Sequence, residues 1–425
     1  MKRILLVTAA FAALACSTAG RAPQPSLGVA VADSARMLTD ISYLASDALE
    51  GRLTGTPGND SAAAYIARRY AALRLKAPYA GYMQNFAARS AAALHTGDTA
   101  GNATQNVVAM IEGTDPVLKD QYIVIGAHYD HLGRSTVSAL DPDARDAIRN
   151  GADDNASGTA AVLELARMFS IEKPRRSIIF ANFSGEEQGL LGSQYFVDNS
   201  PVPLQNIVAM LNFDMVGRMK NDGLMVFGTA TATEMAALID SANPGTLKLT
   251  SSGDGFGSSD HSSFYPKEIP VLHFFTDLHE DYHRASDDTE KINLGGQARV
   301  VDFAHRIARR IDDRPARLTY VRSTAPSRAI GSGQGSQTYL GSVPDMAASE
   351  SPGLKLTGVR PGSPADAGGL QPGDIIVEFG DAVVKDLYSY SDALYSKKPG
   401  DSVRIVYLRD GKRNETTVVL GRRGG

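Results

Sequence analysis

Three apolar runs of strand length constrain the fold of this chain most, because a helical pattern lies between the first two. Each run is flanked by polar turns, and the three cover residues 122–127, 177–183 and 207–213. Between the first two runs, four apolar residues recur at the spacing of one helix face: Val162, Leu165, Ala166 and Phe169. A strand, helix, strand order implies βαβ units. We therefore predict an α/β fold with a mostly parallel, mixed central sheet flanked by helices.

The same reading sets the extent of this domain. A pair of helices precedes the sheet, with apolar residues at helical spacing at Met37, Leu38, Ile41, Leu44, Ile66, Tyr70 and Leu73. A fourth strand over residues 269–275 and a helix with Val300, Ala304, Ile307 and Ile311 on one face complete it. The predicted domain spans residues 33–315. A chain of 425 residues has room for about two or three domains, so at least one more is expected.

Polar side chains gather where the predicted strands end. The five candidates at these ends are His128, Asp130, Glu186, Glu187 and Asp214. In an open α/β sheet, sites form beyond the carboxyl ends of the strands, so these side chains are expected to meet. Taken singly, His128 has a simpler explanation as a core histidine and the two glutamates as a solvated turn, and Asp214 is a weak signal. Their joint arrival at one edge favours a metal site.

Charge and cysteine content exclude several kinds of partner and site. The formal net charge of −4 provides no basic excess to neutralise phosphates, so nucleic acid is not an expected partner. The single cysteine, Cys16, rules out an intrachain disulfide and a thiolate metal cage. Any metal must therefore bind His, Asp and Glu.

The first 20 residues have the pattern of an export signal. Lys2 and Arg3 precede an apolar run over residues 4–15, which is too short for the roughly 20 residues of a membrane span. The run ends at Cys16 in a sequence that resembles a bacterial lipoprotein cleavage box. Two outcomes are open, lipidation of Cys16 or its removal with the signal. We expect an exported protein, either periplasmic, anchored to the outer membrane as a lipoprotein, or secreted.

Five motifs resemble one enzyme family. The runs GAHYDHLG, NGADDNASG, SGEEQGLLGS, LNFDMVG and DYHRASDDTEKIN are similar to those of secreted bacterial dinuclear zinc aminopeptidases of the leucyl aminopeptidase type. That family is related to glutamate carboxypeptidase and glutaminyl cyclase. The resemblance covers residues 33–315, in the family's motif order. It implies the zinc exopeptidase fold and two Zn²⁺ ions per chain.

The resemblance also implies a ligand set and a mechanism. The five metal ligands carried over are His128, Asp153, Glu187, Asp214 and His283, with Asp153 shared by both ions and a cis peptide between it and Asp154. A hydroxide bridging the ions would attack the scissile carbonyl. Glu186, next to a ligand, is the implied general base. Asp130 and Asp287 would orient the rings of His128 and His283.

Other residues near these motifs have predicted places around the site. His131, Asp260 and His261 are expected in the pocket wall or beside the ligands, whereas His273 and His279 are expected to be structural. Phe256, Phe264 and Tyr265 line a pocket for the terminal side chain or pack in the core. Residues 134–150 form a lid or an exposed loop. The substrate amine would bind the metal centre, Glu280 or Asp281.

The C-terminal part differs in character. Residues 316–336 are predicted to be a linker, and residues 337–422 contain short β-rich runs and a helix near residues 390–394. The segments TYLGSVPDM and GVRPGSPADAGGLQPGDIIVEFGD resemble a PDZ domain. By motif position, Leu340, Gly341 and Ser342 would form the loop that receives a peptide's terminal carboxylate. The alternative is a module that braces the peptidase without binding a ligand.

These features predict an exported zinc aminopeptidase that removes N-terminal residues from peptides. Its expected partners are peptides with a free N-terminus and, at the PDZ domain, protein C-termini; membrane contact is expected only through a lipid anchor. Three alternatives stay open. A carboxypeptidase would need a cation for the C-terminal carboxylate, with Arg218 as the candidate. A glutaminyl cyclase would use one zinc. A PDZ-based binding protein would carry a vestigial metal site.

Overall fold

The computed structural model describes most of the chain. It covers residues 30–88, 102–135, 139, 141, 144–243, 245–277, 279–322, 338–344, 351–385, 389–390, 393–394 and 397–422. The predicted signal peptide with Cys16 lies outside these residues, as does most of the predicted linker. Among the described helices, none is long and apolar enough to cross a membrane.

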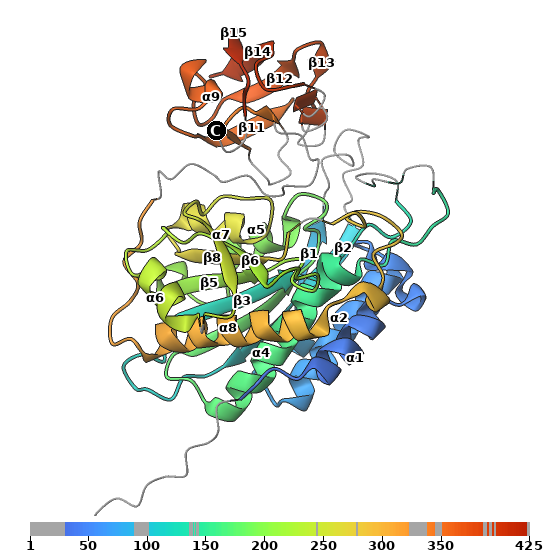
Figure 1. The fold of residues 1–425 in the computed structure, drawn as a ribbon, viewed down its shortest axis with the longest axis vertical. Coiled ribbons are helices and arrows are strands. Elements are labelled where there is room, and N and C mark those ends of the chain that lie inside the picture. Colours follow the sequence, from blue (N-terminus) through green and yellow to red (C-terminus); the bar gives the residue numbers. More distant parts are fainter. Residues whose placement is uncertain are drawn as a thin grey trace, which may run out of the picture.

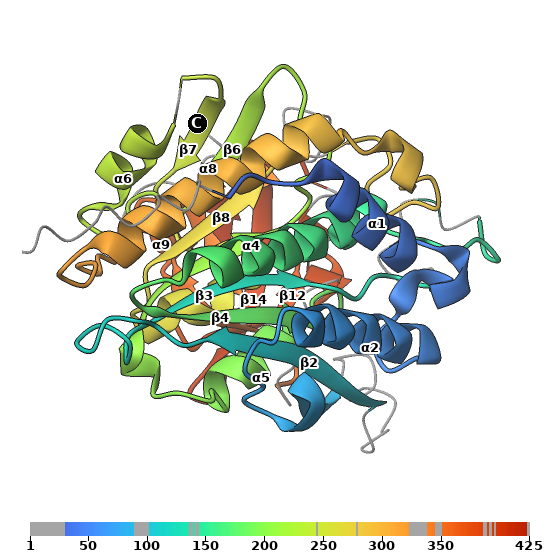
Figure 2. The same cartoon turned by 90° about the horizontal axis from the view of Figure 1, so that it is seen from below.

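An eight-stranded sheet organises the larger part of the structure (Figures 1 and 2). In spatial order its strands are β1 (Met83–Ala88), β2 (Asn102–Ile111), β4 (Ser177–Phe183), β3 (Tyr122–His128), β5 (Ile207–Phe213), β8 (Val271–Phe275), β6 (Gly223–Phe227) and β7 (Lys248–Ser252). The central strands β4, β3, β5 and β8 run parallel, whereas β2 and β6 pair antiparallel with them. The prediction of a mostly parallel, mixed sheet is confirmed.

Helices cover both faces of this sheet, which explains why its central strands are apolar along most of their length. One hydrophobic core joins the sheet to α1 (Ser34–Leu44), α2 (Pro57–Ala72), α4 (Gly158–Glu172), α6 (Met235–Ala242) and α8 (Leu294–Asp313). A second core on the opposite face includes residues of α5 (Leu191–Asp198) and α7 (His261–Phe264). Every residue of β4, β5 and β8 is buried. Because these strands are packed on both faces, the positions of their ends are fixed.

Short helical turns connect these elements. Among the described residues, the 3₁₀ turns are η1 (Asp47–Arg52), η2 (Ala80–Tyr82), η4 (Leu204–Asn206), η5 (Tyr265–Lys267) and η6 (Thr289–Lys291), and η3 (Ala152–Ser157) is a π turn. Local sequence sets several helix starts. Asp33 and Asn293 accept backbone N–H groups at the first turns of α1 and α8. Thr56 caps α2, which begins at Pro57.

The C-terminal part forms two smaller sheets. The larger one contains β10 (Ser342–Pro344), β11 (Leu354–Val359), β12 (Ile375–Phe379), β14 (Ser402–Arg409) and β15 (Lys412–Val419), with β13 (Ala382–Val383) paired to β12. The smaller one pairs β9 (Thr338–Tyr339) with β16 (Gly421–Arg422). The helix α9 (Pro364–Ala367) follows β11, and the described residues within 389–394 are helical, where the sequence predicts a helix. These elements enclose a hydrophobic core of their own.

Gly51 in η1 offers a stability test of the segment that precedes α2. Its φ is +69°, and an added Cβ would lie 2.2 Å from the carbonyl oxygen of Arg149. Gly81 in η2 has a similar φ of +60° but open space around it. We expect Gly81→Ala to lose about 1 kcal/mol of unfolding free energy from the left-handed backbone alone. Gly51→Ala should lose at least about twice as much, since overpacking adds to that cost.

Thermal unfolding of the two purified variants beside the wild type measures this difference. The midpoint of Gly51→Ala should fall several degrees further than that of Gly81→Ala. Equal shifts would mean that the contact of Gly51 with residue 149 does not constrain the fold.

Candidate metal centre

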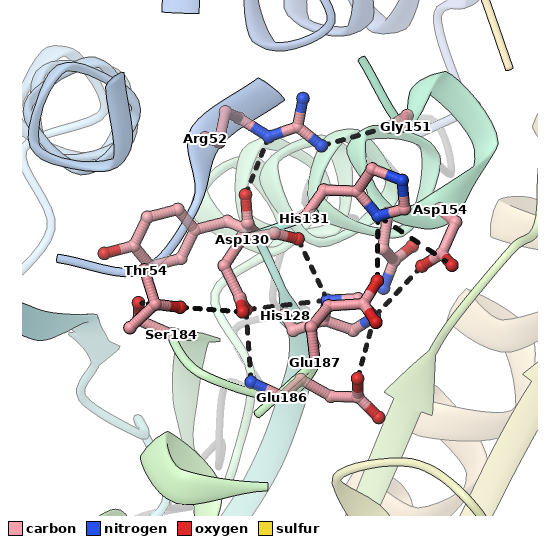
Figure 3. Close-up of polar contacts among 12 residues, drawn as sticks. Arg52, Thr54, His128, Asp130, His131, Gly151, Asp154, Ser184, Glu186 and Glu187 are labelled. Atoms are coloured by element: carbon pink, nitrogen blue, oxygen red, sulfur yellow. Dashed lines mark hydrogen bonds and ion pairs between the residues drawn. The ribbon is translucent and has the colours of Figure 1, made fainter. Parts of the chain in front are cut away.

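Neighbouring strand ends bring the predicted residues to one edge of the sheet (Figure 3). β3 ends at His128, and β5 is followed directly by Asp214. The turn after β4 carries Glu186 and Glu187. The π turn η3, which leads into α4, adds Asp154. Because β3, β4 and β5 are parallel, their carboxyl ends lie side by side, and the side chains that follow them converge.

Asp154 lies between two histidines. Its Oδ1 is 3.4 Å from Nε2 of His128, and its Oδ2 is 3.3 Å from Nε2 of His283. Each histidine faces a further carboxylate, with Asp214 Oδ1 3.5 Å from His128 Nε2 and Glu187 Oε2 3.3 Å from His283 Nε2. Two groups of imidazole and carboxylate donors therefore share Asp154.

The expectation that Asp153 is the shared carboxylate does not agree with this geometry. Its Oδ1 accepts the N–H of Gly217 at 2.6 Å, and its Oδ2 is 3.1 Å from Nε2 of His279. The cis peptide lies between Asp154 and Asn155, one bond later than expected. Two adjacent aspartates on a turn point in different directions, so motif position alone could not decide which one faces the histidines.

Backbone contacts fix the turn that presents Asp154. The Asp287 carboxylate, which the resemblance pairs with His283, accepts the N–H groups of Asp153 at 2.9 Å and Asp154 at 3.0 Å. On the other side, Asn155 accepts the N–H of Gly158 and donates to the carbonyl of Phe213, both at 2.9 Å. Asn155 thereby ties the start of α4 to the end of β5.

Asp130 connects three parts of the site. Its carboxylate accepts the Thr54 hydroxyl at 2.8 Å and the Glu186 backbone N–H at 3.2 Å. Nδ1 of His128 is 3.7 Å from this carboxylate and 3.3 Å from the Asp130 carbonyl oxygen. Besides lying next to the His128 ring as predicted, Asp130 thus holds the turn that carries Glu186 (Figure 3).

His131 contacts a ligand candidate directly. Its Nδ1 is 2.8 Å from Oε1 of Glu187 and 3.9 Å from Oδ2 of Asp154, and the side chain is fully buried. Sequence reasoning placed His131 near the site, and the structure places it beside Glu187. His279, predicted to be structural, pairs with Asp153.

The segment SSDHSSF packs beside the site and is buried from Ser259 onward. The rings of His261 and His273 stack with centroids 4.5 Å apart, and His273 Nδ1 is 3.1 Å from the Asn212 amide nitrogen. Burial lowers the pKa of His273 to about 4 and that of His261 well below its usual value. Burial raises the pKa of Asp260 to about 7. His261 and His273 are therefore neutral at physiological pH.

The three aromatic residues proposed for a substrate pocket differ in position. Phe264 is fully buried in the second core, where its ring packs near Phe183 and Phe196. Tyr265 is also buried and meets the ring of Phe256 edge-on at 4.9 Å. Phe256 is half-buried. Phe264 is thus a core residue.

The loop over residues 134–150 is anchored where the structure describes it. Arg149 is fully buried, and its Nε donates to Asp141 Oδ1 at 2.7 Å. The other Asp141 oxygen accepts the N–H of Ala285 at 2.8 Å, two residues beyond His283. The described part of this loop therefore holds the segment that carries the second histidine.

Sequence reasoning missed two residues of the site, Arg52 and Thr54. Both come from η1 and the turn after it, where the sequence suggested only punctuation between helices. Thr54 donates to Asp130, and Arg52 donates to backbone carbonyls on the segments that follow His128 and precede Asp153. The signal was faint: an arginine and a threonine close to Gly51 and Gly55 in an otherwise helical region.

The charges of the site favour a cation between the carboxylates. Burial opposes ionisation, yet the surrounding carboxylates raise the pKa of His128 and of His283 well above the usual value. The two histidines thus hold protons where positive charge is needed. A divalent cation would displace these protons. The donors are imidazole nitrogens and carboxylate oxygens, a set that suits Zn²⁺. The residues present therefore fit the metal that the resemblance implies.

The predicted carboxylate loop of the C-terminal part has a defined shape. Leu340 is buried, and its carbonyl accepts the N–H of Ala365 at 2.8 Å. Gly341 has a φ of +86°, and an added Cβ would meet the side chain of Ser363. The Ser342 hydroxyl is 2.5 Å from that of Tyr390. Ser342 begins β10, an edge strand of its sheet.

Comparisons with known proteins agree with this picture. A "Probable zinc metalloprotease" of Pyrenophora teres f. teres is 38% identical over 156 residues, which are 35% of this chain and 30% of that protein. "Leupeptin-inactivating enzyme 1" of Streptomyces exfoliatus is 28% identical over 291 residues, 68% of this chain and 58% of that protein. The chain thus spans less than a third of the first relative and somewhat over half of the second.

Solved structures share the fold at low identity. A zinc-dependent exopeptidase from Parabacteroides distasonis superposes with a TM-score of 0.56 at 19% identity, covering 67% of this chain and all of that one. The zinc aminopeptidase BSAP from Bacillus subtilis gives 0.54 at 18%, covering 67% and 97%. A Bacteroides thetaiotaomicron glutaminyl cyclase also gives 0.54 at 18%, covering 66% and 98%. Family models match residues 106–308 to peptidase family M28 and residues 338–420 to the PDZ domain. The chain therefore carries a peptidase family M28 domain with a PDZ domain on its C-terminal side.

Proposed function

We propose that this chain is an exported zinc-dependent aminopeptidase, which uses two metal ions to remove N-terminal residues from peptides. The observation that carries the proposal is Asp154, whose two carboxylate oxygens face two different histidines. One ion would be held by His128, Asp154 and Asp214. The other would be held by Asp154, Glu187 and His283. Zinc supplies a Lewis acid that polarises a carbonyl oxygen and acidifies water.

Glu186 is the proposed proton carrier of this site. Its Oε2 is 4.0 Å from His128 Nε2, and its backbone N–H is held by Asp130. Burial raises the pKa of Glu186 well above its usual value, as suits a base that must also return a proton. In the proposed reaction Glu186 takes a proton from the attacking water and delivers it to the leaving amine.

The surroundings of Arg218 favour an aminopeptidase over a carboxypeptidase. Arg218 was the candidate to bind a substrate carboxylate, but its Nη2 donates to Asp281 at 3.0 Å, and its side chain is only 9% exposed. Asp281 also accepts Ser286 and Lys291, which hold the pKa of Asp281 well below its usual value despite burial. Both members of this pair are engaged, so Asp281 is also a poor partner for the substrate amine. Glu280, which is exposed, remains the proposed alternative to the metal centre.

A mixed peptide pool tests the proposal. Half of the peptides carry free N-termini and half carry acetylated ones, and mass spectrometry follows them during incubation with the zinc-loaded protein. Stepwise loss of N-terminal residues from the free peptides alone is expected. The same assay after chelation of zinc is the control and should show no cleavage.

Other products would redirect the assignment. Trimming from the C-terminus would identify a carboxypeptidase. Peptides beginning with glutamine that lose ammonia, with the chain otherwise intact, would identify a glutaminyl cyclase, whose fold the structure shares. A pool left unchanged by protein that retains zinc would contradict an enzymatic role.

The PDZ domain is proposed to bind the C-termini of proteins. Among the described strands β10 lies at the edge of its sheet, where a peptide strand would add, and it begins next to Gly341. Fluorescence anisotropy with labelled peptides tests this, using the full chain and peptides with a free or an amidated C-terminus. Binding of the free carboxylate form only is expected. Equal binding of both forms, or of neither, would leave the bracing role as the explanation.

The sequence around Cys16 supports export with lipid attachment. The protein expressed with its own N-terminus should incorporate labelled palmitate and fractionate with membranes. Cys16→Ser should abolish both, without loss of zinc binding. Wild-type protein that stays unlabelled in the cytosol would contradict this part of the proposal.

A further inference from the structure

Arg52 is a buried cation whose side chain donates to four backbone carbonyls. Its Nε donates to the carbonyl of Tyr129 at 2.8 Å, and its Nη2 donates to that of Gly151 at 3.0 Å. Its Nη1 donates to the carbonyls of Leu44 and Asn150. The side chain has no exposed surface. Burying a charge this completely is costly unless the charged group is hydrogen-bonded. The four hydrogen bonds offset this cost, and a smaller side chain could not make all of them.

The four carbonyls come from three separate parts of the chain. Tyr129 directly follows His128, and Gly151 lies three residues before Asp154 (Figure 3). Leu44 ends α1. One guanidinium thus joins the end of β3 to the turn that presents the shared carboxylate. Its planar fork of five donors can hold several carbonyls at once, which a lysine ammonium cannot do in the same plane.

The backbone at Arg52 is built for this contact. Residues 50–52 all have positive φ, with a value of +51° at Arg52 itself. A left-handed conformation is unfavourable for a residue with a side chain, and such strain persists where the surroundings require it. The Arg52 carbonyl also accepts the N–H of His131 at 3.4 Å and the amide of Asn59 at 3.3 Å. The guanidinium and the backbone carbonyl of Arg52 therefore both bind the segment that follows β3.

The charge of Arg52 also suits this position. Burial lowers its pKa to about 10, a value at which it stays protonated at physiological pH. The carboxylates of Asp130, Asp154, Asp287 and Glu187 stabilise the positive form. The guanidinium thus interacts electrostatically with a group of buried carboxylates, while its hydrogen bonds go to backbone carbonyls.

We propose that Arg52 is a positioning residue of the metal centre, which sets the spacing between His128 and Asp154 by clamping the carbonyls of their two segments. Arg52 lies within the predicted peptidase domain of residues 33–315, although outside residues 106–308, the range matched to the M28 family. The inference rests on the proposed zinc site, and it concerns metal affinity before it concerns catalysis.

Arg176 provides a matched control. It is also fully buried, and its Nη1 donates to the carbonyls of Ile311, Asp312 and Arg314 at 2.7 to 2.9 Å. It immediately precedes β4, at the opposite end of that strand from Glu186 and Glu187. Replacing Arg176 removes the same kind of carbonyl clamp at a distance from the metal centre.

The experiment compares Arg52→Lys and Arg52→Gln with Arg176→Lys and Arg176→Gln. Zinc affinity is measured by competition with a chromophoric chelator, the coordination geometry by the visible spectrum of the cobalt-loaded protein, and stability by thermal unfolding of the metal-free protein. Both Arg52 variants should bind zinc about 10- to 100-fold more weakly, the usual effect of losing a group that holds a ligand in place, with an altered cobalt spectrum. The Arg176 variants should unfold at lower temperature but bind zinc within about twofold of the wild type.

Each other outcome overturns the inference. Unchanged zinc affinity in the Arg52 variants would show that the clamp does not set the ligand spacing. Full recovery of affinity in Arg52→Lys would make charge alone sufficient. Failure of both Arg52 variants to fold, while both Arg176 variants fold, would assign Arg52 to general stability. If the wild type itself bound no zinc, the proposed function would fail, a result distinct from all of these.

Discussion

Asp154→Asn is expected to lose bound zinc and peptide hydrolysis together. Asp154 is the only described carboxylate with one oxygen within 3.5 Å of each of the two histidine Nε2 atoms, His128 and His283. An asparagine keeps one neutral oxygen and places an amide where the second ion would bind, so both positions weaken. Zinc content after dialysis should fall from about two ions per chain to fewer than one. Elemental analysis of the dialysed protein, beside the peptide assay, measures both losses.

Asp153→Asn is the matched control because the two residues are neighbours of the same type. The Asp153 carboxylate holds the N–H of Gly217 and contacts His279, and asparagine keeps an acceptor for the first of these. We expect this variant to retain two ions, with zinc affinity lowered by no more than about tenfold. The reverse order, with zinc lost in Asp153→Asn and kept in Asp154→Asn, would refute the assignment made from the structure.

Glu186→Gln is expected to keep zinc and lose turnover. Its side-chain oxygen lies 4.0 Å from His128 Nε2, further than that of Asp214 at 3.5 Å, so it can serve as a base without being needed as a ligand. A glutamine has nearly the same shape but takes no proton. The turnover number should fall by about 10²- to 10⁴-fold, the usual contribution of a general base. Steady-state kinetics on a single N-terminally unblocked peptide, with KM measured separately, tests this.

Glu187→Gln separates the two neighbouring glutamates. Glu187 contacts both His131 and His283, so this variant should lose one ion, whereas Glu186→Gln should keep both. Because Glu186 also lies close to His128 and Asp214, the alternative is that it binds metal. Zinc loss in Glu186→Gln equal to that in Glu187→Gln would establish this alternative and remove Glu186 from the role of base.

The fold followed closely from the sequence in its central part and less so at the edges. The strands β3, β4 and β5 are continuous apolar runs because both of their faces are covered, and this pattern is visible in the residues alone. The edge strand β1 alternates between buried and more exposed residues over six residues, whereas β7 has five residues of which only Ser252 is buried; neither strand was predicted. Strands this short contain too few alternations to be recognised from the sequence pattern.

The site shows the same division. The order of strands and the residue types at their ends determined that histidines and carboxylates meet at one edge of the sheet, because parallel strands present their carboxyl ends together. Which of two adjacent aspartates faces the histidines depended on the π turn η3 and on its contacts with Asp287 and Asn155. These contacts join residues far apart in the chain, and no local pattern encodes them.

The sequence by itself therefore determined the α/β architecture, the donor types of the metal centre and the two-part organisation of the chain. Only the tertiary structure decided that Asp154 faces both His128 and His283, that Arg218 is already paired with Asp281, and that Arg52 binds the segments around His128 and Asp154. The physical reason is one of range. Burial patterns repeat along the chain and can be read from it, whereas the direction of a side chain on a turn is set by hydrogen bonds from distant segments.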